Sequence, residues 1–407
     1  MISENKLIHI ENFNFTVNGK KTLKNINLSV GKGEFVGLIG PNGAGKTTLI
    51  KCINGINRGI GKVLIQGREI SELSEKKIAR EVSLMNQNTT VTFPYSALDV
   101  VLMGRYPHIN RFSFEKDRDY EIARTNMRYT DTIQFENTDV TNVSGGERQR
   151  ILFAKVLTQE ADIILLDEPT ASLDIAHEEQ IFKYARELGL QEKTVVAAVH
   201  DLRIAAQYCS RLVLVNQGKI IADGKPEEVL TPENIRETYG VNTVVYRNNL
   251  TGLLDFYIYG HSQNMREEKI HVIAGGTSGE SVMRYLFDKG YNFTTGILWE
   301  GETDFRFADV FGINAVVEKS FSSVCESTLK RNIEKIKESD ITILCNVVFG
   351  KQNFCNLTAA EYAKKLIIIE DTDIDKRDFT GGRANELYRK LRENAVVTRS
   401  ERLHEVI

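Results

Sequence analysis

Cysteine is scarce in this chain, which has five among 407 residues. The five are scattered, odd in number and never spaced as C-x-x-C: Cys52, Cys209, Cys325, Cys345 and Cys355. Such usage argues against a disulfide framework and against a zinc site, and favours reduced thiols.

Long apolar runs and an excess of one charge are also missing. No stretch approaches the roughly 20 apolar residues that span a bilayer, and the first residues lack the charged and apolar regions of a secretory signal. The formal net charge is -3, with both signs interspersed, so there is no basic stripe of the kind that nucleic acid requires. We therefore expect no membrane span and no nucleic-acid partner. The length suggests two or three domains.

One segment matches the phosphate-binding pattern G-x-x-x-x-G-K-[ST]: Gly40-Pro41-Asn42-Gly43-Ala44-Gly45-Lys46-Thr47. An apolar run at 35–39 precedes it, and Thr48-Leu49-Ile50 opens an expected helix. Glycines let successive N–H groups point at phosphate oxygens, and the helix N-terminus adds its positive dipole end. Lys46 can then reach the β- and γ-phosphates, and the Thr47 hydroxyl can ligate Mg²⁺. The alternative is a glycine-rich turn that matches by chance.

A second segment ends in two adjacent carboxylates. The apolar run 163–166 predicts a buried strand of a parallel sheet, with Asp167 and Glu168 at its carboxyl end. Asp167 can hold Mg²⁺ through the water shell of the ion. Glu168 points the other way and can polarise an attacking water as a general base. A strand end with solvated acids is the plain alternative, which the presence of Lys46 disfavours.

A third segment, Val143-Ser144-Gly145-Gly146-Glu147, precedes the apolar face of another expected helix. Ser144 Oγ and the two glycine amides can bind a phosphate. Ser144 with Glu147 three residues later also matches a capping box. Both interpretations can hold together, because a cap leaves other amides of the first turn free.

Taken together, these segments resemble the ATP-binding subunits of ABC transporters. Walker A lies at 40–47, Gln87 takes the Q-loop position, VSGGE stands where the family has LSGGE, and Walker B ends at Asp167. Ala171-Ser172-Leu173-Asp174 matches the D-loop, and His200 matches the switch histidine. The resemblance covers residues 1–260.

The resemblance implies an α/β P-loop fold with a RecA-like core, a helical subdomain and an antiparallel β part. It implies a head-to-tail homodimer that holds ATP and Mg²⁺ between Walker A of one copy and the signature of the other. The nucleotide would be bound by residues 40–48, Gln87, 144–147 and Asp174, and Mg²⁺ by Thr47, Gln87 and Asp167. Glu168 and His200 would be catalytic. Val17 stands where the family usually has an adenine-stacking aromatic, which leaves the preference for ATP over GTP open.

The stretch Ala97–His108 resembles, more narrowly, the ATPases of importers for iron–siderophore, haem and cobalamin complexes, as do Asp201-Leu202 and 224–230. This implies two integral-membrane permease subunits, an external solute-binding protein, and a place at the cytoplasmic face of the membrane. The alternative is a soluble ABC ATPase that acts on nucleic acid or ribosomes. Such proteins usually carry two cassettes or a long coiled-coil insertion, and neither is visible in the sequence.

Residues 269–407 are expected to form a second, smaller domain after a polar linker at 261–268. Apolar strand patterns at 270–274, 295–298, 315–317, 341–344 and 366–369 alternate with helical ones, which predicts a parallel, Rossmann-like sheet. Similar extensions occur on some cobalamin-type ATPases, so we expect a regulatory or ligand-sensing module.

The loop Gly275-Gly276-Thr277-Ser278-Gly279 follows the first of these strands, where such folds bind anions. It lacks the full G-x-G-x-x-G spacing, and a tight turn is the alternative interpretation. Glu300, Glu302 and Asp304 either face the same crevice or belong to a solvated loop. We expect a small anionic ligand near Gly276.

Overall fold

A computed structural model describes residues 6–86, 93–110, 113–169, 175–260 and 266–407. It divides into two compact units, Met1–Phe256 and Tyr257–Ile407, each with its own hydrophobic core. The α/β fold predicted for both parts is confirmed. The domain boundaries 1–260 and 269–407 stay a prediction.

The first unit is built on a six-stranded sheet of order β10-β9-β3-β8-β7-β6. Its strands pair in parallel, except that β10 pairs antiparallel with β9 at the edge. β3, β7 and β8 are buried throughout, which explains their unbroken apolar sequences. Residues that follow these strands meet at one edge of the sheet. The bounds are β3 Phe35–Ile39, β6 Val82–Met85, β7 Ile163–Asp167, β8 Thr194–Ala198, β9 Arg211–Asn216 and β10 Lys219–Gly224.

An antiparallel sheet of order β2-β1-β4-β5 belongs to the same unit. Helix α1 (Lys46–Ile53) packs with both sheets, since Ile8 of β1, Leu38 of β3 and Leu49 of α1 share one buried core. That packing fixes the start of α1 at the edge where β3 ends. The strands are β1 Lys6–Val17, β2 Lys20–Gly31, β4 Ile60–Ile65 and β5 Arg68–Glu69.

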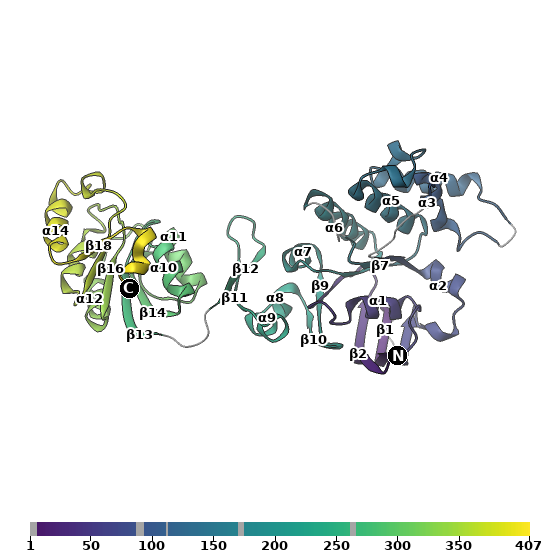
Figure 1. Ribbon diagram of the computed structural model, residues 1–407, viewed down its shortest axis with the longest axis horizontal. Coiled ribbons are helices and arrows are strands. Elements are labelled where there is room, and N and C mark those ends of the chain that lie inside the picture. Colours follow the sequence, from purple (N-terminus) through teal and green to yellow (C-terminus); the bar gives the residue numbers. More distant parts are fainter. Residues whose placement is uncertain (1–5, 87–92, 111–112, 170–174, 261–265) are drawn as a thin grey trace. The chain divides into compact units, whose positions relative to one another are not determined.

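The other face of the central sheet is covered by helices, and α3, α4 and α5 gather in a separate helical part (Figure 1). The buried Arg105 joins this part together: it donates to Asp119 Oδ1 at 2.9 Å, to Thr158 O at 3.0 Å and to Glu160 Oε2 at 2.6 Å. The helices are α2 Glu75–Glu81, α3 Ala97–Leu102, α4 Asp117–Tyr129, α5 Gly145–Thr158, α6 Ile175–Leu190, α7 Leu202–Tyr208, α8 Pro226–Val229 and α9 Pro232–Tyr239. A hairpin follows, with strands β11 Asn242–Arg247 and β12 Leu254–Tyr259.

The second unit has a parallel six-stranded sheet of order β15-β14-β13-β16-β17-β18. This is the doubly wound order 3-2-1-4-5-6. The first three strands are added toward one edge of the sheet, and the fourth to sixth strands are added toward the other edge. The Rossmann-like sheet predicted for this part is therefore confirmed. The strands are β13 Arg266–Ile273, β14 Tyr291–Trp299, β15 Asn314–Glu318, β16 Ile341–Leu344, β17 Leu366–Ile369 and β18 Val396–Thr398.

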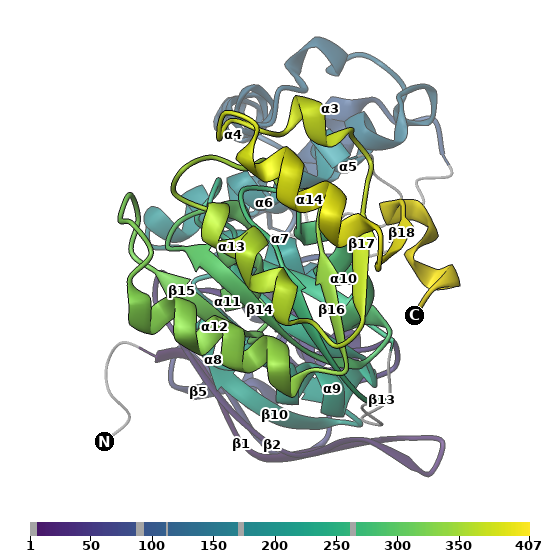
Figure 2. The ribbon, with the colours of Figure 1, turned by 90° about the vertical axis from the view of Figure 1, so that its left-hand side faces the viewer.

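Helices cover both faces of that sheet. α10 (Glu280–Asp288) and α11 (Thr303–Val310) lie on one face (Figure 1). Figure 2 looks onto the other face, where α12 (Glu326–Glu338), α13 (Phe354–Ala359) and α14 (Arg383–Arg392) cross in front of the strands. The loops that follow the central strands line a cavity at the carboxyl end of the sheet.

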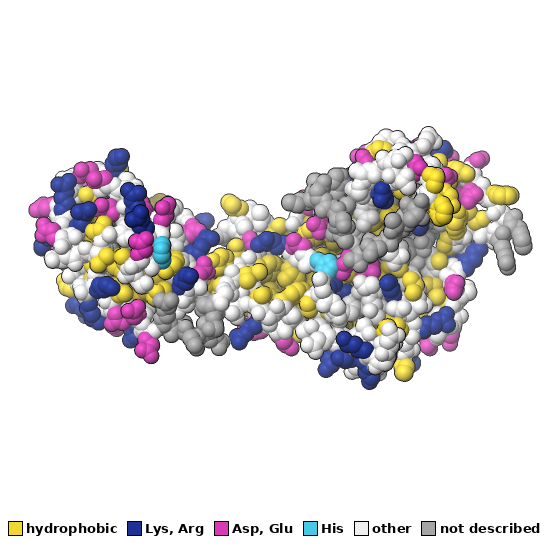
Figure 3. Space-filling view, in the orientation of Figure 1, with side chains coloured by type: hydrophobic (Ala, Val, Ile, Leu, Met, Phe, Trp, Pro, Cys, Tyr) yellow, Lys and Arg dark blue, Asp and Glu magenta, His cyan; other side chains and the backbone are white. Residues whose placement is uncertain are grey.

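No helix in the described part of the chain has the length and apolarity that crossing a bilayer requires. On the face drawn in Figure 3, acidic and basic side chains are interspersed over both units.

We propose that the second unit folds on its own and that it begins before residue 269. Tyr257 and Tyr259 pack their rings on Phe311 and Phe287 at centroid distances of 5.0 and 4.9 Å, and Tyr257 also donates to Asp288. A fragment 257–407 should therefore melt cooperatively, and at a higher temperature than a fragment 269–407. Calorimetry on the two fragments checks this. Equal melting temperatures, or a fragment 257–407 without a cooperative transition, would contradict the proposal.

Candidate active site

The loop 40–45 turns sharply between β3 and α1. Gly40 has φ 144°, and a Cβ added there would lie 2.0 Å from Val215 O, so no other residue fits without moving β9. Gly45 has φ 113° and forms the N-cap of α1. At Gly43, by contrast, an added Cβ would meet nothing within 4 Å. The backbone of the loop is thus fixed at its ends and open at its middle, as a cradle for a ligand would be.

Lys46 lies across this loop. Its ammonium donates to Gly40 O at 2.7 Å and to Pro41 O at 3.2 Å, and the residue is only 4% exposed. Burial lowers the pKa of Lys46, while the nearby carboxylates Glu168 and Asp167 act in the opposite direction. A buried ammonium with neutral acceptors is suited to an anion, because charge-assisted hydrogen bonds are the stronger ones.

Thr47 and Asp167 come together from α1 and β7. The hydroxyl Oγ1 donates to Asp167 Oδ1 at 2.7 Å. Burial raises the pKa of Asp167, and the hydrogen bond from Thr47 partly offsets that effect. A hydroxyl and a carboxylate at this distance are hard oxygen donors of the kind that Mg²⁺ takes. The residues present therefore fit the ion expected from the sequence.

Glu168 and His200 form a second pair. Glu168 Oε1 lies 2.6 Å from His200 Nε2, and the Glu168 side chain is 11% exposed against 46% for His200. β8 runs between β3 and β7, so the residues after it reach the acids at the end of β7. Glu168 has φ 50°, a left-handed conformation that is uncommon outside glycine.

Ser144–Glu147 lie elsewhere, at the start of α5. Ser144 Oγ accepts from Glu147 N at 3.3 Å, and Glu147 Oε2 accepts from Ser144 N at 2.8 Å, which is the predicted capping box. Ser144 and Gly145 are exposed, and an added Cβ on Gly145 would meet nothing within 4 Å. The cap is complete and its surface remains open to another molecule.

Two predicted site residues, Gln87 and Asp174, lie outside the described residues. Thr48 is the third residue of α1 and half-buried, and Val17 ends β1 with 45% of its surface exposed. The structure thus brings Lys46, Thr47, Asp167, Glu168 and His200 to one sheet edge.

In the second unit, the loop 275–279 forms the predicted turn between β13 and α10, and carboxylates of the chain bind several of its amides. Asp304 Oδ2 accepts from Gly275 N and Gly279 N, both at 2.9 Å, and Glu302 Oε2 accepts from Gly276 N at 3.0 Å. Carboxylates of the chain therefore already occupy the amides of the three glycines in this loop. Burial raises the pKa of both acids, and the amide bonds act against that rise. The geometry opposes the small anionic ligand expected near Gly276.

Comparison with known proteins places both units. Residues 23–171 match the family described as ABC transporter, and residues 293–404 match the MJ0874 family. The Cobalamin import ATP-binding protein BtuD of Halobacterium salinarum is 37% identical over 313 residues, which are 76% of this chain and 78% of that protein. The Hemin import ATP-binding protein HmuV of Vibrio cholerae is 38% identical over 236 residues, 56% of this chain and 90% of that protein.

Solved structures of ABC transporter chains also resemble this protein, over a share of the chain close to the size of the first unit. A chain of an inward-facing metal-chelate type ABC transporter superposes with a TM-score of 0.56 at 29% identity, and covers 63% of this chain and 98% of that one. The cbiO1 chain from Clostridium perfringens, part of the ABC transporter complex cbiONQ, superposes with a TM-score of 0.50 at 27% identity, and covers 57% and 94%.

The buried charge of Asp167 should cost stability. Burial raises the pKa of Asp167 in the folded chain. At pH values above its pKa in the unfolded chain, the ionised carboxylate therefore lowers the free energy of unfolding. Asp167→Asn keeps an acceptor for Thr47 and removes the charge, so the melting temperature of the first unit should rise by about 2–4 °C at neutral pH.

The gain should shrink as the pH falls toward 3.8, the ordinary pKa of this carboxyl, because the folded chain binds the proton first and the penalised charge is then lost. Asp162→Asn is the matched control, since Asp162 precedes β7 at its other end and its side chain is 58% exposed. Thermal melts of the three proteins between pH 4 and 8 check this, and a lower melting temperature for Asp167→Asn at pH 7 would contradict it.

Proposed function

Because the chain belongs to the family of ABC transporter ATP-binding proteins, we propose that it is the subunit that drives an importer of a metal chelate of the cobalamin or haem type. It is an ATPase, as members of that family are. The relatives named for cobalamin and hemin import support the choice of solute class. The observation that carries the proposal is the set of five polar side chains that β3, α1, β7 and β8 bring to one sheet edge.

Binding of ATP would begin at the loop 40–48. Its backbone amides would receive phosphate oxygens, and Lys46 would exchange the carbonyls of Gly40 and Pro41 for the β- and γ-phosphates. Thr47, Gln87 and, through water, Asp167 would hold Mg²⁺, which supplies positive charge to the phosphate oxygens. The bond between Thr47 and Asp167 already keeps two of these groups together.

Hydrolysis would rest on Glu168 as the general base that takes a proton from the attacking water. His200, 2.6 Å from the Glu168 carboxylate, would hold that carboxylate in place and contact the γ-phosphate. Fixing the base in advance lowers the cost of reaching the reactive geometry.

A second copy would complete the site. The cap formed by Ser144–Glu147, of which Ser144 and Gly145 are exposed, would bind the γ-phosphate held by the Walker A loop of the other chain. Asp174 would link the two sites. ATP then joins the two chains, and its cleavage lets them separate. Helices α3 and α4 would receive the two permease subunits at the cytoplasmic face of the membrane, with an external solute-binding protein completing the system.

Glu168→Gln should bind ATP, form a stable dimer and hydrolyse at least about 100-fold more slowly, the lower end of what a general base contributes. ATP turnover and size-exclusion chromatography with ATP and Mg²⁺ measure both effects. Glu192→Gln, which changes a carboxylate that is 76% exposed and paired with Lys32, serves as the control. Normal turnover by Glu168→Gln would refute the role of the base.

Lys46→Ala should weaken ATP binding at least about tenfold, because losing one charge-assisted bond costs roughly 1.5–3 kcal/mol. Cells that carry only this variant should lose uptake of labelled cobalamin or of haem, whichever the importer carries. Lys62→Ala, at a position 63% exposed on β4, should change neither property. Unimpaired uptake of both solutes by Lys46→Ala cells would exclude the importer, and copurifying ribosomes would favour the soluble alternative.

A further inference from the structure

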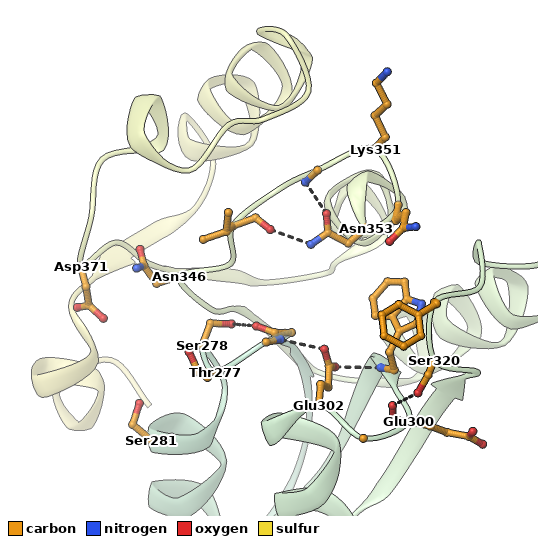
Figure 4. A pocket seen from close by; sticks show the side chains of 18 residues that line it. Thr277, Ser278, Ser281, Glu300, Glu302, Ser320, Asn346, Lys351, Asn353 and Asp371 are labelled. Atoms are coloured by element: carbon orange, nitrogen blue, oxygen red, sulfur yellow. Dashed lines mark hydrogen bonds between the residues drawn. The ribbon is translucent and has the colours of Figure 1, made fainter.

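The second unit contains a large cavity that the ATPase reaction does not use. Its volume is about 1110 Å³, and it lies at the carboxyl end of the sheet, lined by the loops that follow β13, β14, β15, β16 and β17 (Figure 4). The point between β13 and β16, where the strand order reverses, is the place at which open parallel sheets bind ligands. Ordinary ligand pockets measure roughly 300–1,000 Å³, so this one admits a large molecule.

Charge limits what that molecule can be. The lining of the cavity contains three carboxylates and one cation. The carboxylates are Glu300, Glu302 and Asp371, and the cation is Lys351. Two of the carboxylates are held in place: Glu302 accepts from Gly276 N and Trp299 N at 3.0 Å, and Asp371 Oδ1 accepts from Ser400 N at 2.9 Å. An excess of fixed carboxylates disfavours a ligand with a net negative charge and favours a neutral ligand that donates hydrogen bonds.

The rest of the lining combines amides and hydroxyls with exposed apolar surface. Asn346, Thr277 and Ser281 offer polar groups around the cavity. Phe321 and Val348 also line it, and they are 97% and 54% exposed. Such a surface suits a ligand with a broad apolar body and polar, uncharged groups at its periphery.

The relatives differ in whether they extend into this unit. The 313 residues matched by the cobalamin import protein of Halobacterium exceed the 256 residues of the first unit, so that match continues into the second. The hemin import protein of Vibrio matches 236 residues, fewer than the first unit holds, although 90% of its own length is covered. The match to the relative named for cobalamin import thus includes part of the second unit.

From charge, size and this difference, we propose that the cavity between the loops after β13 and β16 binds a corrinoid. Corrinoids carry uncharged carboxamide groups around a broad macrocycle, and these can donate to Glu302 and Asp371 and accept from Asn346. Cyanocobalamin has one phosphodiester, whose charge the cobalt centre balances, so the molecule has no net charge. Haem has a similar macrocycle but carries ionised carboxylates, which the acidic lining repels. The proposal rests on the proposed function, in that it assigns the cavity to the solute that the importer carries.

The test is calorimetric titration of the full-length protein with cyanocobalamin, with hemin and with NADPH. We expect binding of cyanocobalamin alone. Ser281→Tyr, which fills the cavity from an exposed position on α10, should weaken that binding at least about tenfold. Ser327→Tyr is the matched control, because Ser327 is likewise the exposed second residue of its helix, α12, after a glutamate. It should bind as the unmodified protein does.

Phe321→Asn provides a second variant, since it removes the exposed ring and asparagine tolerates the φ of 60° at this position. It should also weaken binding. No binding of cyanocobalamin, equal binding by the Ser281→Tyr and Ser327→Tyr proteins, or binding of hemin or NADPH in its place would overturn the proposal.

ATP turnover and cobalamin uptake are followed for the same proteins. If both persist without corrinoid binding, the cavity assignment alone fails; if both are absent in the unmodified protein, the proposed function fails.

Discussion

The hydrogen bond between Thr47 and Asp167 joins two segments that are 120 residues apart in the chain, and the geometry of the first unit depends on it. It connects the first turn of α1 to the end of β7, across the width of β8. Lys46, the residue before Thr47, and Glu168, the residue after Asp167, lie at the same sheet edge, where Gly40 O and His200 bind them. Because both partners are largely withdrawn from water, the bond also holds a carboxylate where its charge is unfavourable until a cation compensates it.

The sequence was sufficient for the local parts of this arrangement. The glycines of the loop 40–45, the buried strand before Asp167 and the capping box at Ser144 follow from short-range patterns, and the structure has all three. The contact between Glu168 and His200 could not be derived in that way. It requires β8 to lie between β3 and β7, and strand order is a property of the whole sheet that no local pattern contains. The family resemblance supplied the role of His200, which the residues alone did not. Roles of individual residues stay predictions.

In the second unit, too, local patterns predicted the secondary structure but not the contacts between distant segments. Alternating strand and helix patterns predicted its parallel sheet, and the sheet is there. The glycine loop at 275–279 also lies where it was placed, yet the expectation of an anion there is not supported. The three glycine amides of that loop are bound by Glu302 and Asp304, which follow β14. The sequence left open whether these acids face the crevice or solvent, because the path of a loop is set by its packing. A carboxylate in the chain thus takes the place that a phosphate has in related folds.

The capping box at the start of α5 affects the rate at which a partner can associate, as well as the local geometry. Ser144 and Glu147 satisfy each other's backbone groups, so this surface is rigid before anything approaches it. A partner that brings a bound phosphate loses little conformational entropy there, because no segment has to become ordered on contact. Association would then be governed by encounter rather than by a folding step, and a short-lived nucleotide state would suffice to capture the second chain.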